Sequence, residues 1–379
     1  MILGLLKETE GENRVALLPE HVKQLTEMKV EMLVEEQAGV RAFASDDAYR
    51  EAGAKVEKRS SLIAKADVLL QIHGPEDELS AQLREGQVWC SVFNPLMNQE
   101  LVHQFVKNRI TTFSLDNIPR TSRAQAMDVL SSMATVAGYK AILEAALRLP
   151  TFFPMFMTAA GTIRPANVLV LGAGVAGLQA IATARRLGAR VEAFDVRAAA
   201  GEEVRSLGAR FIEVEGASES KSAGGYAVEQ DEDFKQRQQK AINEHAAKAN
   251  VVLCTAQIPG RKAPLLLPAE AVEKMKPGSV IIDLAASTGG NCELSKNNET
   301  VEHHGVTIIG QSNYPSTMAV DASRMFGKNV FNFLKLIINE DGGLNLNFED
   351  DIVKGTCISH QGEIISERVK SIIDQQQSS

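Results

Sequence analysis

Cysteine is scarce in this 379-residue sequence, and its spacing excludes several kinds of site. The four cysteines lie far apart with no Cys-x-x-Cys pair: they are Cys90, Cys254, Cys292 and Cys357. The seven histidines offer no metal-ligand spacing apart from the adjacent His303 and His304, which we expect to be solvated on a helix-to-strand turn. The pattern predicts reduced thiols in small buried positions and no metal site.

Clusters of positive charge are also missing. The formal net charge is −8, and no run of lysine and arginine is long enough to form a phosphate-binding face. Nucleic-acid and anionic-lipid partners are therefore not expected, because both are bound through dense cationic surfaces.

No segment has the character of a membrane span or a targeting peptide. The longest weakly charged stretch, 128–147, contains Asp128, Lys140 and Glu144, which would be costly in hydrocarbon. We interpret it as a segment of a buried helix. The N-terminus has no basic start and meets Glu8 early, so we expect no secretory signal and a cytoplasmic location.

The composition that remains is ordinary for a globular protein, with 44% hydrophobic and 23% charged residues. Its length suits two domains. From residue 2 to residue 114, short β-rich runs alternate with amphipathic helical runs, which is typical of a parallel sheet covered by helices. An Ala-rich helix is expected over 122–147, as a bridge between domains.

A second α/β unit begins at Asn167. Its six expected strands are 168–171, 190–195, 210–213, 251–255, 279–285 and 307–310. A further helix is expected over 316–338, followed by a strand pair within 355–366 and a polar tail. We predict an α/β fold with two Rossmann-like, doubly wound parallel-sheet domains joined by long helices. The first domain would comprise 1–130 and 320–379, with the second, 131–319, inserted between.

One segment differs from the rest in composition. Residues 215–233 are polar and rich in Gly and Ser, with Gly224, Gly225 and Tyr226 at their centre, so we expect a mobile surface loop. The charge-dense run 231–248 is expected to be the solvent face of a helix.

A Gly-x-Gly-x-x-Gly pattern follows the strand at 168–171, formed by Gly172, Gly174 and Gly177. Gly172 permits a tight turn, Gly174 lets the backbone approach a pyrophosphate, and Gly177 allows close packing of helix on strand. The phosphates would lie at the helix N-terminus, beside Val175 and Ala176. The same glycines would also suit a strand-to-helix turn without a ligand.

An acidic residue stands where a ribose-binding group is expected. Asp195 ends the next strand, 23 residues after Gly172 (195 − 172). A carboxylate there accepts hydrogen bonds from the adenosine ribose and repels a 2′-phosphate, so we predict NAD(H) rather than NADP(H). Val196 and Arg197 complete the expected contact, and Arg197 keeps the NADP(H) alternative open because a cation suits a 2′-phosphate.

Several strings in this chain resemble the NAD(H)-binding domain of proton-translocating NAD(P) transhydrogenase, the α-subunit component, and more distantly alanine dehydrogenase. The strings are 12–16 (ENRVA), 119–128 (PRTSRAQAMD), 172–177 (GAGVAG), 224–227 (GGYA) and 283–293 (DLAASTGGNCE). The resemblance spans nearly the whole chain.

The resemblance implies which residues hold the rest of the nucleotide. The residues implied beside the nicotinamide are Arg120, Gln125, Asp128 and Ser131, and the further implied contacts are Thr121, Ser122, Arg123 and Gln257. Tyr226, after Gly225, would fold over bound nucleotide. From the residues alone, Arg120 and Asp128 would simply cap a helix beginning near Ser122.

Alanine dehydrogenase shares the implied fold, but its chemistry needs a Lys and a His near the amino acid and an Asp late in the sheet. The corresponding positions here are Gln71, Asn94 and Ser287, which cannot transfer a proton near pH 7. Direct hydride transfer between two nicotinamides moves no proton at the reacting carbons. Arg14 matches the position that holds the substrate carboxylate in alanine dehydrogenase, but we favour an ion pair within the first domain.

The resemblance therefore implies a component that passes a hydride from NADH to NADP+ bound on a partner component. The expected partners are membrane and NADP-binding transhydrogenase components and a second copy of the chain, with attachment to the inner face of a membrane through the partner subunits. The alternatives are an alanine dehydrogenase-like oxidoreductase and an NAD-sensing module without chemistry.

Overall fold

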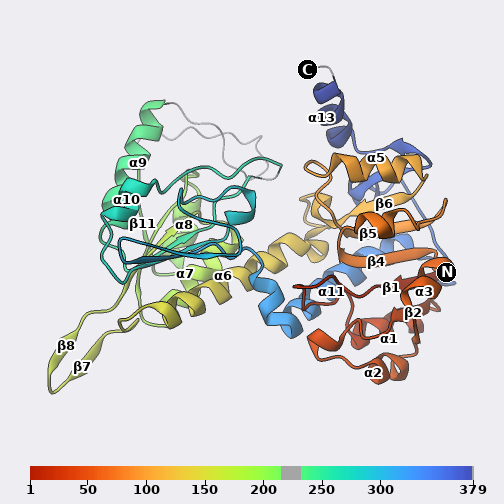
Figure 1. The fold of residues 1–379 in the computed structure, drawn as a ribbon, viewed down its shortest axis with the longest axis horizontal. Coiled ribbons are helices and arrows are strands. Elements are labelled where there is room, and N and C mark those ends of the chain that lie inside the picture. The colour runs from red at the N-terminus through yellow and green to blue at the C-terminus, as the bar shows by residue number, and fades with distance from the viewer. Residues whose placement is uncertain (215–231, 259, 378–379) are drawn as a thin grey trace. The chain divides into compact units, whose positions relative to one another are not determined.

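The computed structural model describes residues 1–214, 232–258 and 260–377. The chain divides into two compact units, which are labelled by element in Figure 1. Unit 1 contains Met1–Met133 and Ser316–Ser379, and unit 2 contains Ala134–Pro315. Helix α6 (Val129–Arg148) begins in unit 1 and ends in unit 2.

Unit 1 is built on an eight-stranded sheet in the order β17-β16-β6-β5-β4-β1-β2-β3. Its parallel strands are β1 (Ile2–Leu5), β2 (Glu31–Glu35), β3 (Lys55–Glu57), β4 (Val68–His73), β5 (Val88–Val92) and β6 (Thr111–Ser114). The strands β16 (Cys357–His360) and β17 (Glu363–Ile364) are antiparallel and extend the sheet beyond β6. They form the strand pair expected within 355–366.

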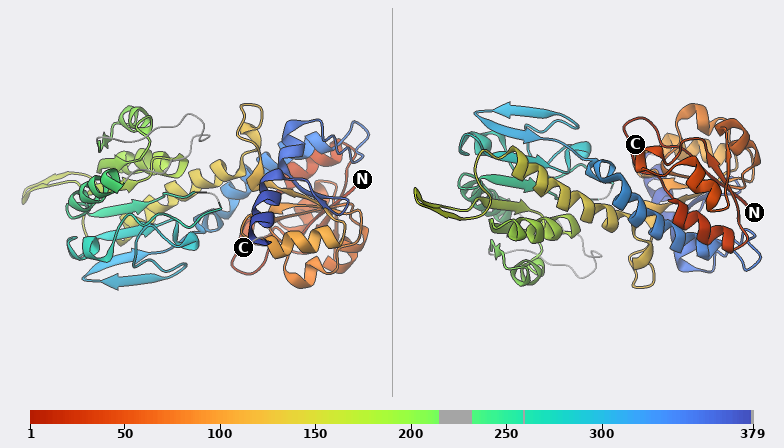
Figure 2. Two further views of the ribbon diagram at one scale, coloured as in Figure 1. Left: turned by 90° about the horizontal axis from the view of Figure 1, so that it is seen from above. Right: turned by 90° about the horizontal axis from the view of Figure 1, so that it is seen from below.

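Helices cover both faces of this sheet (Figure 2). One core packs residues of α1 (Pro19–Glu27), α2 (Asp46–Glu51), α11 (Ala319–Ile337) and α12 (Asp351–Thr356) against one face. The other core packs residues of α3 (Arg59–Lys65), α4 (Asp77–Ser80), α5 (Gln99–Lys107) and α13 (Glu367–Gln377) against the opposite face. Both faces are covered, which explains why β4 is buried over five of its six residues.

Unit 2 contains a seven-stranded sheet in the order β11-β10-β9-β12-β13-β15-β14. Its strands are β9 (Asn167–Leu171), β10 (Arg190–Phe194), β11 (Arg210–Phe211), β12 (Val251–Cys254), β13 (Val280–Asp283), β14 (Thr300–His303) and β15 (Val306–Ile309). All neighbours are parallel except β14 and β15. A separate antiparallel hairpin, β7 (Phe156–Thr158) and β8 (Gly161–Ile163), projects from the body of the unit (Figures 1 and 2).

Two apolar cores lie on opposite faces of the unit 2 sheet. One contains residues of α6, α7 (Val175–Arg186) and α8 (Ala200–Ser206), and the other contains residues of α9 (Glu232–Ala246) and α10 (Ala269–Glu273). The two doubly wound α/β sheets predicted from the sequence are therefore confirmed. No helix within the described ranges is both long and apolar enough to cross a membrane.

Several sequence predictions were wrong at element boundaries. The bridging helix begins at Val129 rather than Ser122, because residues 125–127 form a 3₁₀ turn and Asp128 caps the N-terminus of the α-helix that follows. Its Oδ1 accepts a hydrogen bond from the Ser131 amide at 2.9 Å. The helix expected from 316 begins at Ala319, after a 3₁₀ segment η6 (Tyr314–Met318).

The edges of both sheets also differ from expectation. A helix that was not predicted, α13, covers residues 367–377 and so includes the first three residues of the polar tail expected over 375–379. Val369 and Ile373 on this helix are buried one helical turn apart. A strand that was not predicted, β14, places His303 and His304 in a strand-to-strand turn rather than between a helix and a strand. The expected loop 215–233 is described only from residue 232, where α9 already begins.

Candidate functional site

The chain reverses direction after β9, at the three glycines of the Gly-x-Gly-x-x-Gly pattern, here called the glycine turn. Gly172 has a φ of 101°, which L side chains rarely adopt, and a Cβ there would lie 2.6 Å from Thr255 Oγ1. A Cβ on Gly177 would lie 1.9 Å from the Gly172 carbonyl oxygen. The backbone therefore requires glycine at both positions whether or not a ligand is bound.

Gly174 differs from the other two glycines. Its φ of −78° is accessible to any residue, and no described atom lies within 4 Å of an added Cβ. It is exposed and forms the N-cap of α7, whose first amides have no partners within the helix. Protein packing gives no reason for glycine here, whereas close approach of a pyrophosphate to the helix N-terminus does.

Asp195 lies directly beside the glycine turn, as the sequence spacing predicts. Its Oδ2 accepts a hydrogen bond from the Ala173 amide at 2.8 Å, and the side chain is 7% exposed. Arg197 occupies the remaining acceptor positions of the Asp195 carboxylate. Its amide and Nε donate to Oδ1 at 2.8 and 2.9 Å, and its Nη2 donates to Oδ2 at 2.9 Å. These hydrogen bonds raise the pKa of Arg197. A ribose hydroxyl that reaches Asp195 must therefore take the place of one Arg197 contact.

The remaining predicted residues of unit 2 lie around the same end of the sheet. Val175 and Ala176 open α7, Val196 follows Asp195, and Gln257 follows β12 with its side-chain amide donating to the Leu284 carbonyl at 3.2 Å. Gly225 and Tyr226 lie outside the described residues.

Three further residues, which were not among the predicted site residues, make hydrogen bonds at this end of the sheet. Thr255 Oγ1 donates to the Gly172 carbonyl at 2.9 Å. Asn291 donates to the Ala256 and Pro264 carbonyls and accepts from the Ala256 amide. Asp283 accepts from the amides of residues 285, 291 and 292. The positions of Asp283 at the end of β13 and Thr255 directly after β12 were the available signal, because loops at the carboxyl ends of parallel strands line such sites.

The predicted nicotinamide residues occupy the 120–131 segment of unit 1. Arg120 and Gln125 are exposed, whereas Asp128 and Ser131 are partly buried and bind each other. Ser131 Oγ donates to Asp128 Oδ2 at 2.6 Å. The segment is anchored to α11, since Asn329 and Asn332 both donate to the Ala126 carbonyl, at 2.9 and 3.0 Å. Asp128 therefore caps helix α6, as its residue type alone predicts.

Arg123 of the same segment is committed to an ion pair within unit 1, while Thr121 and Ser122 are exposed. Its guanidinium binds Asp350 through two hydrogen bonds of 2.7 Å and also contacts Asp351. The hydrogen bonds from Arg123 lower the pKa of Asp350 to about 2. Asp350 in turn caps α12 through the Ile352 and Val353 amides. Arg123 thus fastens the segment to α12.

Unit 1 contains a polar cluster formed by Glu8, Glu12, Arg14 and His73, of which the sequence indicated only an ion pair of Arg14. Glu8, Glu12 and Arg14 are buried, whereas the His73 side chain is 45% exposed. Arg14 binds both oxygens of Glu12, at 2.8 and 2.6 Å, which confirms the expected ion pair. His73 Nε2 lies 2.9 Å from Glu12. Burial alone would raise the pKa of Glu12, but hydrogen bonds from Arg14 and His73 and the charge of Arg14 outweigh it and hold that pKa well below its usual range.

The pKa of Glu8, in the same polar cluster, is shifted in the opposite direction to that of Glu12. Glu8 accepts a hydrogen bond from the Ile72 amide at 2.6 Å, yet burial raises its pKa to about 7. Gln71, beside it on β4, donates to the Lys7 carbonyl, and its Oε1 is buried with no hydrogen-bond partner among the described atoms. The position of Glu8 shortly after β1 could have indicated this cluster.

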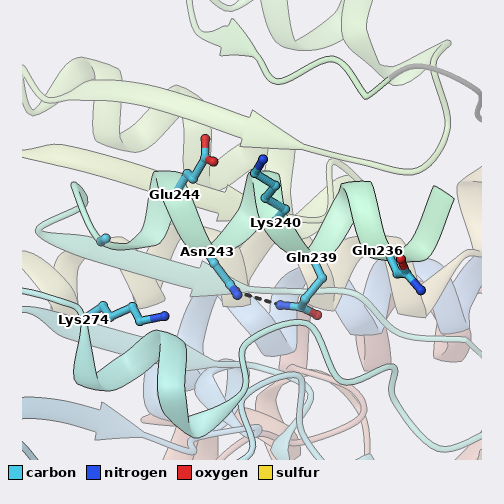
Figure 3. A pocket seen from close by; sticks show the side chains of 7 residues that line it. Gln236, Gln239, Lys240, Asn243, Glu244 and Lys274 are labelled. Carbon is cyan, nitrogen blue, oxygen red and sulfur yellow. Dashed lines mark hydrogen bonds between the residues drawn. The ribbon is translucent and has the colours of Figure 1, made fainter. Parts of the chain in front are cut away.

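All four cysteines are buried free thiols, as the sequence predicts. Burial raises the pKa of each, to about 11 for Cys292 and about 12 for Cys357. A surface pocket along α9 and α10 is lined by Gln236, Gln239, Lys240, Asn243, Glu244, Ala247 and Lys274 (Figure 3). None of these residues belongs to the predicted site.

Known proteins match this chain along almost its full length. Residues 4–137 match the family model "Alanine dehydrogenase/PNT, N-terminal domain", and residues 141–367 match the corresponding C-terminal domain model. An NAD(P) transhydrogenase subunit alpha protein of Rhodospirillum rubrum is 46% identical over 376 residues, which cover 96% of this chain and 98% of that protein. An alanine dehydrogenase of Bacillus subtilis is 29% identical, over 84% of this chain and 80% of that protein.

A solved structure gives the same result. The crystal structure of transhydrogenase from Sinorhizobium meliloti superposes with a TM-score of 0.88 and 41% identity, covering 96% of this chain and all of that one. An L-alanine dehydrogenase structure superposes with a TM-score of 0.83 at 23% identity, which shows a common fold.

Proposed function

The chain belongs to the alanine dehydrogenase/PNT family, and on that premise we propose that it is the NAD(H)-binding component of a transhydrogenase. It passes a hydride from NADH to NADP+ bound on a partner component. The supporting observation is the much greater identity to transhydrogenase α subunits than to alanine dehydrogenases, over 96% of the chain. Membrane and NADP-binding partners follow from membership of a multi-subunit enzyme.

The residues of unit 2 hold the adenosine diphosphate end in this proposal. The N-terminus of α7 faces the pyrophosphate, with Gly174 allowing close approach, and Asp195 accepts hydrogen bonds from the ribose. Val175, Ala176, Val196, Arg197 and Gln257 surround these groups.

The 120–131 segment of unit 1 orients the nicotinamide, from which NADH supplies the hydride when bound. Arg120 and Gln125 lie at the surface of this segment, and the Asp128–Ser131 hydrogen bonds hold its backbone where α6 begins. None of these residues needs to exchange a proton, because a hydride passes directly between the two rings. The protein therefore needs only to orient the nicotinamide ring and to exclude water from it.

Alanine dehydrogenase-like oxidation is the second candidate, because Arg14 matches a carboxylate-binding position. In this structure Glu12 already binds the Nε and Nη2 edge of the buried Arg14 guanidinium, so a substrate carboxylate would have to compete with Glu12 for that edge. Gln71 binds the Lys7 carbonyl, and Ser287 accepts no proton near pH 7. We therefore expect no NADH formation from alanine and NAD+ by this chain alone.

Reconstitution with an NADP-binding transhydrogenase component tests the proposal. Reduction of an NAD analogue, acetylpyridine adenine dinucleotide, by NADPH is followed by absorbance. Arg120→Ala should slow transfer at least about tenfold while the NADH Kd changes less than about threefold, since Arg120 orients the ring. Arg109→Ala, which removes an exposed ion pair with Glu85 in the same unit, is the matched control. Unchanged transfer in Arg120→Ala would refute the role of Arg120, and no transfer by the wild-type pair would refute the function.

We also propose a homodimer, attached through partner subunits to the inner, cytoplasmic face of a membrane. The hairpin β7–β8 is exposed along its full length, and Phe152, Met155 and Met157 nearby are 52%, 56% and 76% exposed. A two-stranded hairpin of this kind is marginal without a covering partner. Met157→Asp should shift the chain toward monomer in analytical ultracentrifugation, whereas an unchanged dimer would place the interface elsewhere.

A further inference from the structure

The turn between β14 and β15 places two imidazoles beside one carboxylate, far from the nucleotide residues. His303 Nε2 lies 3.3 Å from Glu273 Oε1, and His304 Nε2 lies 4.0 Å from the same oxygen. The two imidazole rings stack with their centroids 4.5 Å apart. All three candidate ligand atoms lie within 4.8 Å of one another, and no other such group of three is present in the described segments of the chain.

The backbone around these side chains is held in place. His303 pairs with Val306, so His304 and Gly305 form a two-residue turn, with φ of 50° and 75°. The Gly278 amide donates to the Gly305 carbonyl at 2.7 Å and pins the turn. Glu273 ends α10, where the preceding Ala271 and Val272 are fully buried. All three ligands therefore project from fixed positions in unit 2.

The spacing suits a transition-metal ion. Two ligand atoms about 2.0–2.1 Å from a tetrahedral Zn²⁺ lie about 3.3 Å apart, which equals the His303–Glu273 separation. The His304–Glu273 separation is 4.0 Å, so the His304 side chain must move closer to Glu273 for both groups to bind one ion. Imidazole with carboxylate is a donor set for Zn²⁺, Ni²⁺ or Cu²⁺ rather than for Mg²⁺ or Ca²⁺. The side chains are 31%, 58% and 44% exposed for His303, His304 and Glu273, so water can complete the coordination.

We propose that Glu273, His303 and His304 form a surface site for a divalent transition-metal ion that clips α10 to the β14–β15 hairpin. Val272 of α10 and Val306 and Ile308 of β15 already share one core. The ion adds a cross-link between elements that are packed together in the folded state, and it stabilises unit 2 by binding that state only.

This site is separate from the glycine turn. Strand β14 lies four strands from β9 in the sheet order, or roughly 19 Å at the usual strand spacing. The register also puts the two features at opposite ends of the strands. His303 is level with the starts of β15 and β13, whereas the glycine turn follows the carboxyl end of β9. Metal binding should therefore leave NADH binding unchanged.

Titration of the full-length, tag-free chain with ZnCl₂ by isothermal calorimetry tests the proposal. We expect one ion per chain with micromolar affinity and a thermal midpoint raised by several degrees. His303→Ala, His304→Ala and Glu273→Gln should each weaken binding at least about tenfold. His245→Ala is the matched control, because among the described residues His245 contacts a single carboxylate, that of Glu192, at 2.6 Å.

Two outcomes would overturn the proposal. Wild-type protein that binds no Zn²⁺ would overturn it, and so would His303→Ala or Glu273→Gln protein that binds Zn²⁺ as tightly as wild type. NADH titration of each variant reports correct folding. Co²⁺ provides a second readout, because its visible absorption should show tetrahedral coordination in wild type and lose it in His303→Ala.

Discussion

The two units share a sheet topology, but they place different groups at the point where the strand order reverses. Each sheet has a point where the strand order reverses, at β1 in unit 1 and at β9 in unit 2. Ligands of doubly wound sheets bind outside the carboxyl ends of strands at such a point. In unit 1 the polar cluster of Glu8, Glu12, Arg14 and His73 occupies it, whereas in unit 2 the glycine turn lies there.

This difference shows that the sheet alone does not make a nucleotide site. Unit 1 places its own carboxylates and guanidinium at the strand ends, so the charges satisfy each other. Unit 2 places backbone amides and an exposed helix N-terminus there, which suits an anionic ligand. In the proposed function, the groups at the strand ends therefore determine that unit 2 rather than unit 1 binds the adenosine end of the nucleotide.

The largest expected effect comes from adding a methyl group to the glycine turn. Gly177→Ala forces a Cβ to 1.9 Å from the Gly172 carbonyl, so the turn must shift and NADH binding should weaken more than about 100-fold, near 3 kcal/mol. Gly174→Ala should keep the fold, because no described atom crowds that position, yet weaken NADH at least about tenfold. Calorimetry and urea unfolding separate the two effects. Gly174→Ala protein that binds NADH normally would contradict the placement of the pyrophosphate.

The next largest effect concerns Glu8, in the polar cluster of unit 1. The pKa of Glu8 is raised from 4.5 to about 7 by burial, so between these pH values the folded chain holds a proton that the unfolded chain has lost. The free energy of unfolding should therefore fall as pH rises from 4.5 to 7 and level off above it. The difference between the two pKa values of Glu8 corresponds to at most about 3 kcal/mol, and we expect the free energy of unfolding to fall by about 2 kcal/mol.

Glu8→Gln isolates this contribution because it keeps the shape and removes the charge. The variant should be more stable than wild type near pH 8 and similar to it near pH 4.5, measured by urea unfolding. Equal pH dependence in the two proteins would show that Glu8 is not protonated when folded. NADH affinity should stay unchanged in this variant, since the proposed function places the adenosine end on unit 2.

The smallest effect concerns the choice of nucleotide. Asp195→Asn should lower the preference for NADH over NADPH by about tenfold, because the repulsion of a 2′-phosphate is lost and Arg197 is released from its ion pair. Fluorescence titration with both nucleotides gives the ratio. An unchanged ratio in Asp195→Asn would mean that Asp195 does not contact the ribose region.

The sequence predicted those features of the fold and site that depend on backbone and periodicity. The alternating strands and helices and the glycine turn beside Asp195 are visible in the chain because each is local. The partners of Arg123 and Glu8 could not be predicted, since Asp350 and Ile72 lie 227 and 64 residues away from them in the sequence. Strand β14 was missed for another reason: it is a short edge strand with alternating exposure and charged residues, and a polar loop looks the same in sequence.

The role of the 120–131 segment, in contrast, was implied by the family resemblance and not by a local sequence pattern, and it remains a proposal. Its residues alone indicate a helix cap, and Asp128 forms one. Arg120 carries no local pattern that marks it as a nicotinamide contact.

Transfer of a deuterium label tests the central claim most directly. NADH deuterated at the transferring C4 position is mixed with the chain, NADP+ and an NADP-binding component, and the NADPH formed is examined by mass spectrometry. Direct hydride transfer predicts NADPH that carries the label without dilution by solvent protons. Unlabelled NADPH, or label lost to water, would contradict the account.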